Sequence, residues 1–239
     1  MFNKGKADLV VNFINCLKHV DGKWYGKPFD LLPWQEESIR EFYGTVEETD
    51  DELIKRIYQY LYYEIPKKNG KSELAAALGL YHTFCDGEMH GEVYVCAADK
   101  DNASIIYNVA LGMIEQCPFL EKRCRITESK REILDTASKT RFKVLSSEAY
   151  SKHGYKPSCV IFDELHSQPN RELWDIMTFG AGSARLQPVW IVLTTAGDDP
   201  DRHSIGWEVH EKARRIKEFR EGITEGNYDN QVWLPVELS

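Results

Sequence analysis

The sequence predicts an α/β protein whose mainly parallel sheet carries helices on both faces. Short apolar runs of strand length alternate with helical patterns along most of the 239 residues, as in sheets built from strand–helix–strand units. Apolar residues make up 42% and aromatic residues 12% of the chain, which is enough to bury one sizeable core. The unusual polar residues follow apolar runs, at the carboxyl ends of strands where such sheets bind ligands.

The first elements follow from capping and composition. Pro33 and the acids after it predict a helix start, because proline suits a first turn and acids favour the positive end of the helix dipole. The acidic run 47–52 predicts a surface loop, and 56–65, rich in Tyr, Ile and Leu, predicts a strand. A polar turn at 67–72 and a helix at 73–85 should follow.

The same alternation continues along the rest of the chain. In order, we expect a strand at 92–97, a helix at 102–115, two or three short antiparallel strands within 125–146, a buried strand at 158–162, a helix at 171–178, a strand at 189–195, a charged amphipathic helix at 204–219 and a final strand at 232–236.

Composition also excludes several classes of protein. No stretch approaches the roughly 18 apolar residues of a membrane span, and the N-terminus lacks the apolar run and cleavage site of a signal peptide. The six cysteines are scattered without a Cys-x-x-Cys pair, which favours reduced, mostly buried thiols over a zinc site. We therefore expect a soluble intracellular protein with no membrane contact.

Charge is distributed unevenly along the chain. The formal charge is −8, from 30 basic and 38 acidic side chains, but residues 121–156 alone hold 10 basic and 5 acidic ones. This basic block predicts either a solvated face or a track for a polyanion such as nucleic acid. The acidic total argues against tight non-specific DNA binding by this chain alone.

The stretch from Ile65 to Ser72 has most features of a phosphate-binding loop. Such a loop needs amides that converge at a helix N-terminus, a glycine for the turn, a lysine for the β- and γ-phosphates and a hydroxyl for Mg²⁺. Gly70, Lys71 and Ser72 supply the last three, whereas Ile65 replaces the first glycine of the G-x-x-x-x-G-K-[ST] pattern. Taken alone, the stretch also fits an ordinary helix start.

Two further apolar runs end in groups that suit phosphoryl transfer. The first leads into Asp163, which would hold Mg²⁺, and Glu164, which would polarise an attacking water; a helix cap is the plain alternative. The second ends in Thr194 and Thr195, where a hydroxyl could sense the γ-phosphate, or which could simply end a strand. Together with the loop, these runs predict a P-loop NTPase of the RecA/ASCE-like type that binds ATP and Mg²⁺.

At this point the residues resemble a known family, the large terminase subunits of tailed phages, in the group related to phage HK97. The segments that carry the resemblance are PWQ (33–35), EIPKKNGKS (64–72), HGYKPSCVIFDELH (153–166), GAGSAR (180–185) and QPVWIVLTTAG (187–197). They occur in family order, and a Walker A motif without its first glycine is itself common among terminases. The resemblance implies a motor ATPase that pumps double-stranded DNA into a procapsid.

The resemblance also implies roles for individual residues. The nucleotide-binding set is Lys68, Asn69, Gly70, Lys71 and Ser72 in the loop, with Thr194 and Thr195 as the coupling motif and Gln35 as the reader of adenine. The metal would be held by Ser72 and Asp163, and Glu164 would be the catalytic carboxylate.

Basic residues of the predicted site depart from the family pattern or leave a choice. The family often has arginine at the position of Lys67, and a lysine there keeps the charge but loses the bidentate fork. A basic residue of a neighbouring subunit is expected to complete each site, and we favour Arg185 over Lys152 for this role. The implied assembly is a homo-oligomeric ring, typically a pentamer, at the portal of a procapsid in the host cytoplasm, with the small terminase subunit as a further partner.

The domain organisation expected from this resemblance is an N-terminal segment at 1–32 and an ATPase domain at 33–239. Terminases also carry a C-terminal nuclease domain of the RNase H type, and this chain stops about where that domain should begin. No acid cluster remains to serve such a domain, so no nuclease activity is expected here.

Two other functions compete with the terminase hypothesis. Asp163-Glu164-Leu165-His166 spells a DExH box and Gln35 could play a Q motif, as in a superfamily 2 helicase lobe, but such helicases need a second lobe. A non-catalytic nucleotide-binding adaptor is the other alternative. The intact Lys71, Asp163 and Glu164 argue against it, since a switch without hydrolysis need not keep Glu164.

Overall fold

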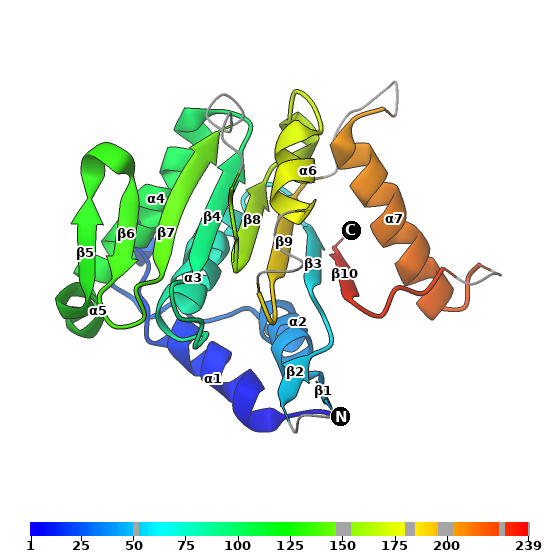
Figure 1. The fold of residues 1–239 in the computed structure, drawn as a ribbon, viewed down its shortest axis with the longest axis horizontal. Helices are drawn as coiled ribbons and strands as arrows, with labels where there is room; N and C mark the ends of the chain where they lie inside the picture. Colours follow the sequence, from blue (N-terminus) through cyan, green and yellow to red (C-terminus); the bar gives the residue numbers. More distant parts are fainter. Residues whose placement is uncertain (50–52, 147–153, 180–184, 196–202, 225–227, 239) are drawn as a thin grey trace.

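The computed structural model describes residues 1–49, 53–146, 154–179, 185–195, 203–224 and 228–238. Its main feature is an eight-stranded sheet in the order β10-β3-β9-β8-β4-β7-β6-β5 (Figure 1). Their bounds are β10 (Trp233–Glu237), β3 (Tyr60–Glu64), β9 (Val189–Thr194), β8 (Cys159–Asp163), β4 (Glu92–Ala97), β7 (Arg141–Ser146), β6 (Glu132–Asp135) and β5 (Cys124–Thr127). The first six are parallel, and β6 and β5 continue the sheet antiparallel.

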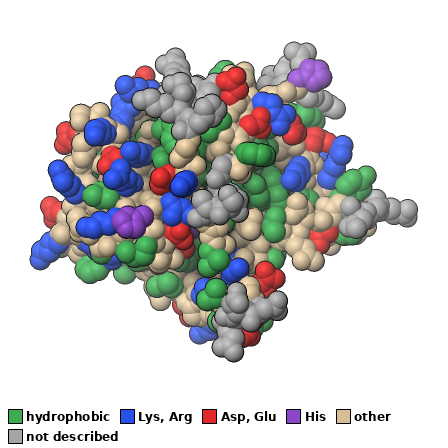
Figure 2. All heavy atoms as spheres, in the orientation of Figure 1, with side chains coloured by type: hydrophobic (Ala, Val, Ile, Leu, Met, Phe, Trp, Pro, Cys, Tyr) green, Lys and Arg blue, Asp and Glu red, His purple; other side chains and the backbone are tan. Residues whose placement is uncertain are grey.

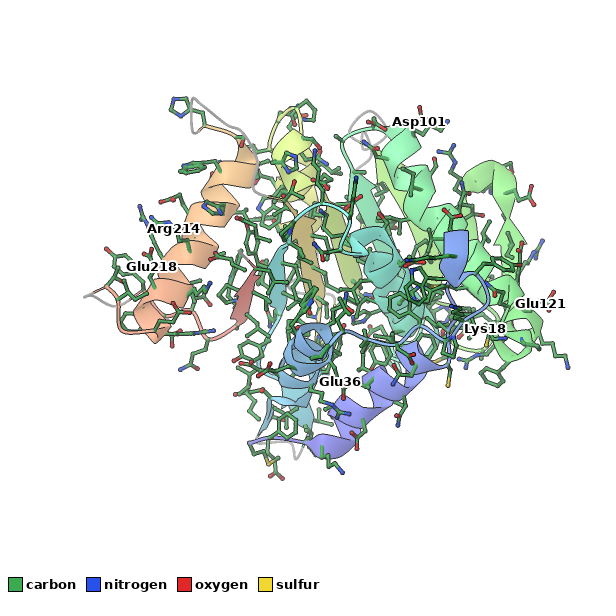
Figure 3. The ribbon with its side chains drawn as sticks, turned by 180° about the vertical axis from the view of Figure 1, so that it is seen from behind. Lys18, Glu36, Asp101, Glu121, Arg214 and Glu218 are labelled. Atoms are coloured by element: carbon green, nitrogen blue, oxygen red, sulfur yellow. The ribbon has the colours of Figure 1, made fainter. Side chains whose placement is uncertain are left out.

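One face of this sheet packs against the helices of the first half of the chain. These helices are α1 (Lys4–Asn15), α2 (Pro33–Gly44), α3 (Lys71–Phe84), α4 (Lys100–Glu115) and α5 (Pro118–Arg123). Figure 3 views the molecule from this side, with Glu36 on α2 and Asp101 on α4. Leu61, Val95 and Ile161 point into the core that the sheet shares with these helices.

The opposite face packs against α6 (Glu172–Phe179) and α7 (Ile205–Arg220). Tyr62, Val160 and Val192 point to this side, because successive residues of a strand face opposite ways. The predicted α/β sheet with helices on both faces is therefore confirmed, and its continuous apolar strands follow from burial on both sides. Among the described residues, no helix is long and apolar enough to cross a membrane.

The strand expected at 56–65 is two strands. β2 (Ile54–Arg56) pairs with β1 (Val46–Glu48) in a separate small sheet, and β3 begins only at Tyr60. The buried Arg56 side chain accounts for the break, because its guanidinium donates to the carbonyl oxygens of Tyr58 and Gln187 at 2.7 and 3.0 Å. A buried cation needs such acceptors, and the chain turns to provide them.

Part of the acidic run expected to be a loop is also a strand. Glu47 and Glu48 belong to β1, where Glu47 lies opposite Lys55 of β2, and Val46 anchors the strand in the core. Opposite charges across two antiparallel strands stabilise the pair. Residues 50–52 of the run lie outside the described part of the chain.

The segment 1–32 packs into the same core as the rest of the chain. Val10, Ile14 and Leu17 are buried there with Phe29. His19 reaches the first turn of α3, where its Nδ1 lies 3.0 Å from Oε2 of Glu73. This segment, which includes the helix α1 that the sequence patterns did not predict, therefore supports the start of α3.

Candidate nucleotide-binding and catalytic site

The phosphate-binding loop predicted from the sequence joins β3 to α3. Gly70 is the residue before the helix and has φ 72°, ψ 23°, a left-handed conformation that costs other residues about 1–2 kcal/mol. Space for a Cβ atom exists at Gly70, so its conformation rather than crowding calls for glycine. The Asn69 side chain closes the turn by donating to the Pro66 carbonyl at 3.1 Å.

The missing first glycine of the loop has a structural reason. Ile65 is fully buried, and its N–H donates to the carbonyl oxygen of Thr194 at 2.9 Å, extending the pairing of β3 with β9. An apolar strand residue serves this position better than glycine, because it adds core packing to the backbone bond. The turn therefore begins one residue later, at Pro66.

Lys71 lies at the centre of the site. Its side chain is buried, although it lies at the start of a helix, and its Nζ lies 3.4 Å from Oε1 of Glu164 and 3.3 Å from the Ile65 carbonyl oxygen. The two residues Lys71 and Glu164 are 93 positions apart in the sequence, so the fold alone brings them together. A buried ammonium group with these partners is ready to bind an anionic phosphate.

Three strand tips meet at this place because β9 lies between β3 and β8. Backbone hydrogen bonds tie them together, from Ile65 N to Thr194 O and from Glu164 N to Leu193 O, at 2.9 and 2.8 Å. The loop, the acid pair and the threonine pair therefore share one edge of the sheet, as the parallel arrangement predicts.

The Glu164 carboxylate receives three side chains. Besides Lys71, the Thr195 hydroxyl donates to Oε2 at 3.2 Å, and Nδ1 of His166 lies 3.3 Å from the same oxygen. Glu164 also has φ 50°, an uncommon conformation for a residue other than glycine. This turn directs the carboxylate back over the tips of β3 and β9.

The Asp163 carboxylate lies in a different environment from that of Glu164. Its side chain is buried, and burial together with the neighbouring Glu164 charge raises the pKa of Asp163 from 3.8 to about 6. A buried acid whose charged form is disfavoured is stabilised by a cation. In the described residues, no group of three His, Cys, Asp or Glu side chains could hold a metal by itself.

His166, the last residue of the DExH sequence, has defined contacts in the structure. Its Nδ1 lies 2.9 Å from the Thr194 hydroxyl, which itself donates to the Thr195 carbonyl at 3.2 Å. Because that hydroxyl proton is engaged, we assign the ring proton to Nδ1, which donates to Thr194 and faces Glu164. His166 thus connects the acid pair with the threonine pair.

The start of α7 fixes the position of His166. A Cβ on Gly206 would lie 2.5 Å from the His166 Cα atom, so only glycine allows this approach. Further along α7, Nδ1 of His210 lies 2.7 Å from Oε2 of Glu64, the last residue of β3 before the loop. The pKa of His210 is raised, mainly by this hydrogen bond with Glu64, so α7 is anchored to two strand tips of the site.

The other predicted basic residues lie apart from this cluster or are solvent-exposed. Lys67 and Lys68 are exposed on the loop, and Lys68 has φ 69°. Arg185 lies near the amino ends of β4 and β8, on the opposite side of the sheet from the strand tips of the site. There its guanidinium donates to the carbonyl oxygens of His90 and Lys156 and to the Glu88 carboxylate. With these acceptors and a side chain 11% exposed, it does not contact the site of its own chain.

A role for Arg185 in a neighbouring subunit's site stays a prediction, but one that would require breaking its contacts within the chain. Lys152, the other candidate for this role, lies outside the described residues. The structure therefore brings together Lys71, Glu164, Thr194 and Thr195, with Asp163 beside them, and leaves Arg185 out.

Gln35 is buried at the start of α2. Its Oε1 accepts a hydrogen bond from the Leu32 N–H at 2.9 Å, which caps the helix. One residue earlier, the Trp34 ring packs edge-on against Tyr63 of β3, with centroids 5.8 Å apart. The structure thus gives Gln35 a local role in capping, and adenine reading by this side chain stays a prediction.

Comparisons with known proteins support the resemblance to large terminase subunits. Residues 33–215 match the family described as "Terminase large subunit, ATPase domain". The chain is 29% identical over 205 residues to the terminase large subunit of Enterobacteria phage HK97, an alignment that covers 84% of this chain and 39% of that protein. The chain thus spans less than half the length of this relative.

Solved structures show the same fold. The crystal structure of the HK97 large terminase superimposes with a TM-score of 0.73 at 23% identity, over 93% of this chain and 43% of that one. A mutant ATPase domain of the Thermus phage P74-26 large terminase matches with a TM-score of 0.50 at 17% identity, over 59% of this chain and 61% of that one. The family match favours the terminase hypothesis over the helicase lobe, and the chain belongs to the family of terminase large subunit ATPase domains.

Proposed function

We propose that this chain is a Mg²⁺-dependent ATPase that converts ATP to ADP and phosphate and drives double-stranded DNA into a phage procapsid. The observation that carries the proposal is the meeting of Lys71, Glu164 and Thr195 at adjoining strand tips, within the region that matches the terminase ATPase family. These residue types at this edge of a parallel sheet are those that phosphoryl transfer needs.

Binding of the nucleotide phosphates falls to the loop and Lys71. The N-terminus of α3 offers backbone N–H groups to an anion, and Lys71 carries the positive charge beside them. A phosphate group would compete with Glu164 for the Lys71 ammonium. That exchange would release the Glu164 carboxylate at the moment when substrate arrives.

The residues near Lys71 suit Mg²⁺. The Ser72 hydroxyl and the Asp163 carboxylate are hard oxygen donors, and Mg²⁺ in nucleotide sites takes few protein ligands besides phosphates and water. The raised pKa of Asp163 fits a group that gains by pairing with a cation. When bound, the ion would neutralise charge on the β- and γ-phosphates.

Hydrolysis itself falls to Glu164, which would orient the attacking water and accept its proton. The hydroxyl of Thr195 and the ring of His166 hold this carboxylate in place, and Thr194 joins the network through His166. Loss of the γ-phosphate would therefore change the contacts of the threonine pair and of α7, which packs on His166.

In its assembled form, we propose that the protein acts as a homo-oligomeric ring, typically a pentamer, at the portal of a procapsid in the host cytoplasm. The portal protein, the small terminase subunit and double-stranded DNA would be its partners. The support for these partners is membership of the terminase family, and the boundary between an N-terminal segment and an ATPase domain at residue 32 stays part of the proposal.

The first experiment is the steady-state rate of ATP hydrolysis per chain as protein concentration rises, with Glu164→Gln as the blank. We expect a per-chain rate that climbs with concentration, because a neighbouring subunit supplies the missing basic residue. Lys152 and Arg185 would then be the next residues to replace. A measurable but constant rate would instead assign the basic role to Lys67 or Lys68 of the same chain.

The network around His166 leads to a second expected result. Replacing His166 by Ala should lower kcat about tenfold, because the Glu164 carboxylate and Thr194 lose their shared donor. His166→Asn should recover most of the rate, since its amide nitrogen can replace Nδ1. The affinity for ATP should change little in either variant, and equal losses in kcat for Ala and Asn would contradict a role based on this hydrogen bond.

A further inference from the structure

Part of the sheet has no helix over one face. In the described residues, the core beneath α6 and α7 takes side chains from β3, β9, β8, β4 and β10, and none from β5 or β6. The helices α3 and α4 cover the opposite face of β7 (Figure 1). Near the end of β7, Leu145 still packs against that core, so within the described ranges the face open to solvent comprises β5, β6 and the first part of β7, around Arg141.

Basic side chains lie in register across this open face. Arg125 of β5 pairs with Leu134 of β6, which pairs with Arg141 of β7, so all three side chains point to the same side. That side is the open one, because the neighbouring residues Ile133 and Phe142 point into the opposite core. Arg125 and Arg141 are both exposed and lie two strand spacings apart, about 10 Å.

A depression of about 550 Å³ adjoins this row of side chains. It is lined by His90, Gly91, Glu92, Leu134, Lys139 and Arg141. Figure 2 shows the same side of the molecule, where Lys and Arg side chains gather over β5, β6 and β7. This surface, made by Arg125, Lys139 and Arg141, is called the basic sheet face below.

The acids beside the basic sheet face are engaged within the chain, and two of them are neutralised by a cation. Glu132 lies 2.7 Å from the Lys143 ammonium, and Glu88 lies 2.9 Å from the Arg185 guanidinium. Glu92, which lies opposite Arg141 in the pairing of β4 with β7, accepts hydrogen bonds from the Tyr94 hydroxyl and the Lys156 N–H, both with Oε2, and keeps its negative charge. In the part of the chain that the structure describes, no carboxylate forms an ion pair with Arg125 or Arg141, so the three cations of the basic sheet face outnumber the one uncompensated carboxylate, Glu92.

Charges on α7 show the contrasting arrangement. Arg214 binds both Glu211 and Glu218, and Arg220 binds Asp229. Figure 3 labels Arg214 and Glu218 on this helix. Because these cations are neutralised by their own neighbours, α7 has little charge left to attract a polyanion, unlike the basic sheet face.

We propose that the basic sheet face binds the phosphate backbone of double-stranded DNA. The inference rests on the proposed packaging function and adds to it the surface that contacts the DNA. Unpaired cations on an exposed strand surface can contact phosphates without reading bases, as sequence-independent translocation requires. A stable protein interface would be depleted of charge at its centre and richer in apolar side chains, whereas this face has two arginines flanking a single leucine.

The proposal is tested by measuring how tightly the chain binds a labelled duplex of about 30 base pairs. Fluorescence anisotropy gives the affinity at salt concentrations between about 25 and 200 mM. The test variant is Arg125→Glu with Arg141→Glu, and Arg125→Gln with Arg141→Gln is a milder second variant. The control, Lys4→Glu with Arg215→Glu, makes the same change in net charge at exposed positions on α1 and α7. Thermal unfolding and ATP hydrolysis without DNA are measured on each.

The two arginine variants should bind the duplex at least about tenfold more weakly, and the slope of log affinity against log salt should fall by about 2, one for each arginine that no longer neutralises a phosphate. The control should stay within about twofold of the unaltered chain. Equal weakening in the control, or unchanged binding in the arginine variants, would overturn the proposal. So would loss of self-association, seen by sedimentation, with DNA binding unchanged.

The same experiment separates this inference from the proposed function. ATP hydrolysis without DNA depends on Lys71 and Glu164, and none of the three double variants changes either residue. If the chain binds DNA through the basic sheet face but hydrolyses no ATP, the proposed ATPase activity is wrong and the proposed DNA-binding surface is retained. If the chain hydrolyses ATP but the arginine and control variants bind DNA equally well, the proposed ATPase activity is retained and the proposed DNA-binding surface is wrong.

Discussion

Glu164→Gln should reduce kcat for ATP hydrolysis by a factor of about 10² to 10⁴, while the affinity for ATP is retained or increased. The amide has nearly the same shape as the carboxylate and can still accept the hydrogen bond from Thr195, so the site should keep its structure. It cannot accept a proton from the attacking water. It also no longer forms the ion pair with Lys71 at 3.4 Å, which leaves the ammonium free for phosphate.

The measurement combines steady-state hydrolysis with a titration of a fluorescent ATP analogue, because the first reports turnover and the second reports binding. Glu208→Gln is a matched control, since that exposed acid on α7 pairs with Arg171 on the protein surface. The control should hydrolyse ATP at the rate of the unaltered chain. If Glu164→Gln does the same, Glu164 is not the catalytic carboxylate.

Asp163→Asn should abolish Mg²⁺-dependent hydrolysis and at the same time stabilise the metal-free protein by about 3 kcal/mol near pH 7. The carboxylate is buried, and its pKa of about 6 in the folded chain exceeds the ordinary value of 3.8. Folded chains therefore hold a proton that unfolded chains release as the pH rises from 3.8 towards 6. Stability must fall across that window, and the Asn variant, which has no proton to lose there, should not show this fall.

Urea unfolding from about pH 4 to pH 8, without metal or nucleotide, measures the difference directly. Added Mg²⁺ and ATP should then raise the midpoint of the unaltered chain more than that of Asp163→Asn. The control is Asp175→Asn, a half-exposed acid on α6 that pairs with Arg171, and its stability should stay within about 0.5 kcal/mol. If the Asp163→Asn variant is no more stable than the unaltered chain near pH 7, the charge at this buried position is not unfavourable.

Local sequence patterns were sufficient to predict most of the parallel sheet and its helices. The apolar runs ending at Asp163 and Thr194 are strands that are buried on both faces, and burial of that kind requires continuous apolar residues whatever the order of the strands. The glycine before Lys71 similarly depends on backbone conformation, which is a local property. These features could be predicted because their causes lie within a few residues.

Other features depended on contacts between distant segments. The break between β2 and β3 follows from acceptors that Gln187 provides to Arg56, and helix α1 packs on partners more than 15 residues away. The placement of Arg185 near the amino ends of the strands likewise depends on Glu88 and His90. A sequence pattern contains no information on such pairings unless the order of the strands is known.

The sequence by itself determined the chemical groups of the site, the strand and helix that carry each, and through its motifs the terminase family. Only the tertiary structure decided which of these groups meet. It placed β9 between β3 and β8, brought Lys71 and Thr195 to Glu164 and Thr194 to His166, and left Arg125 and Arg141 exposed on one face. The physical reason is that strand order is set by burying both faces of the whole sheet, a requirement shared by all strands and encoded in none alone.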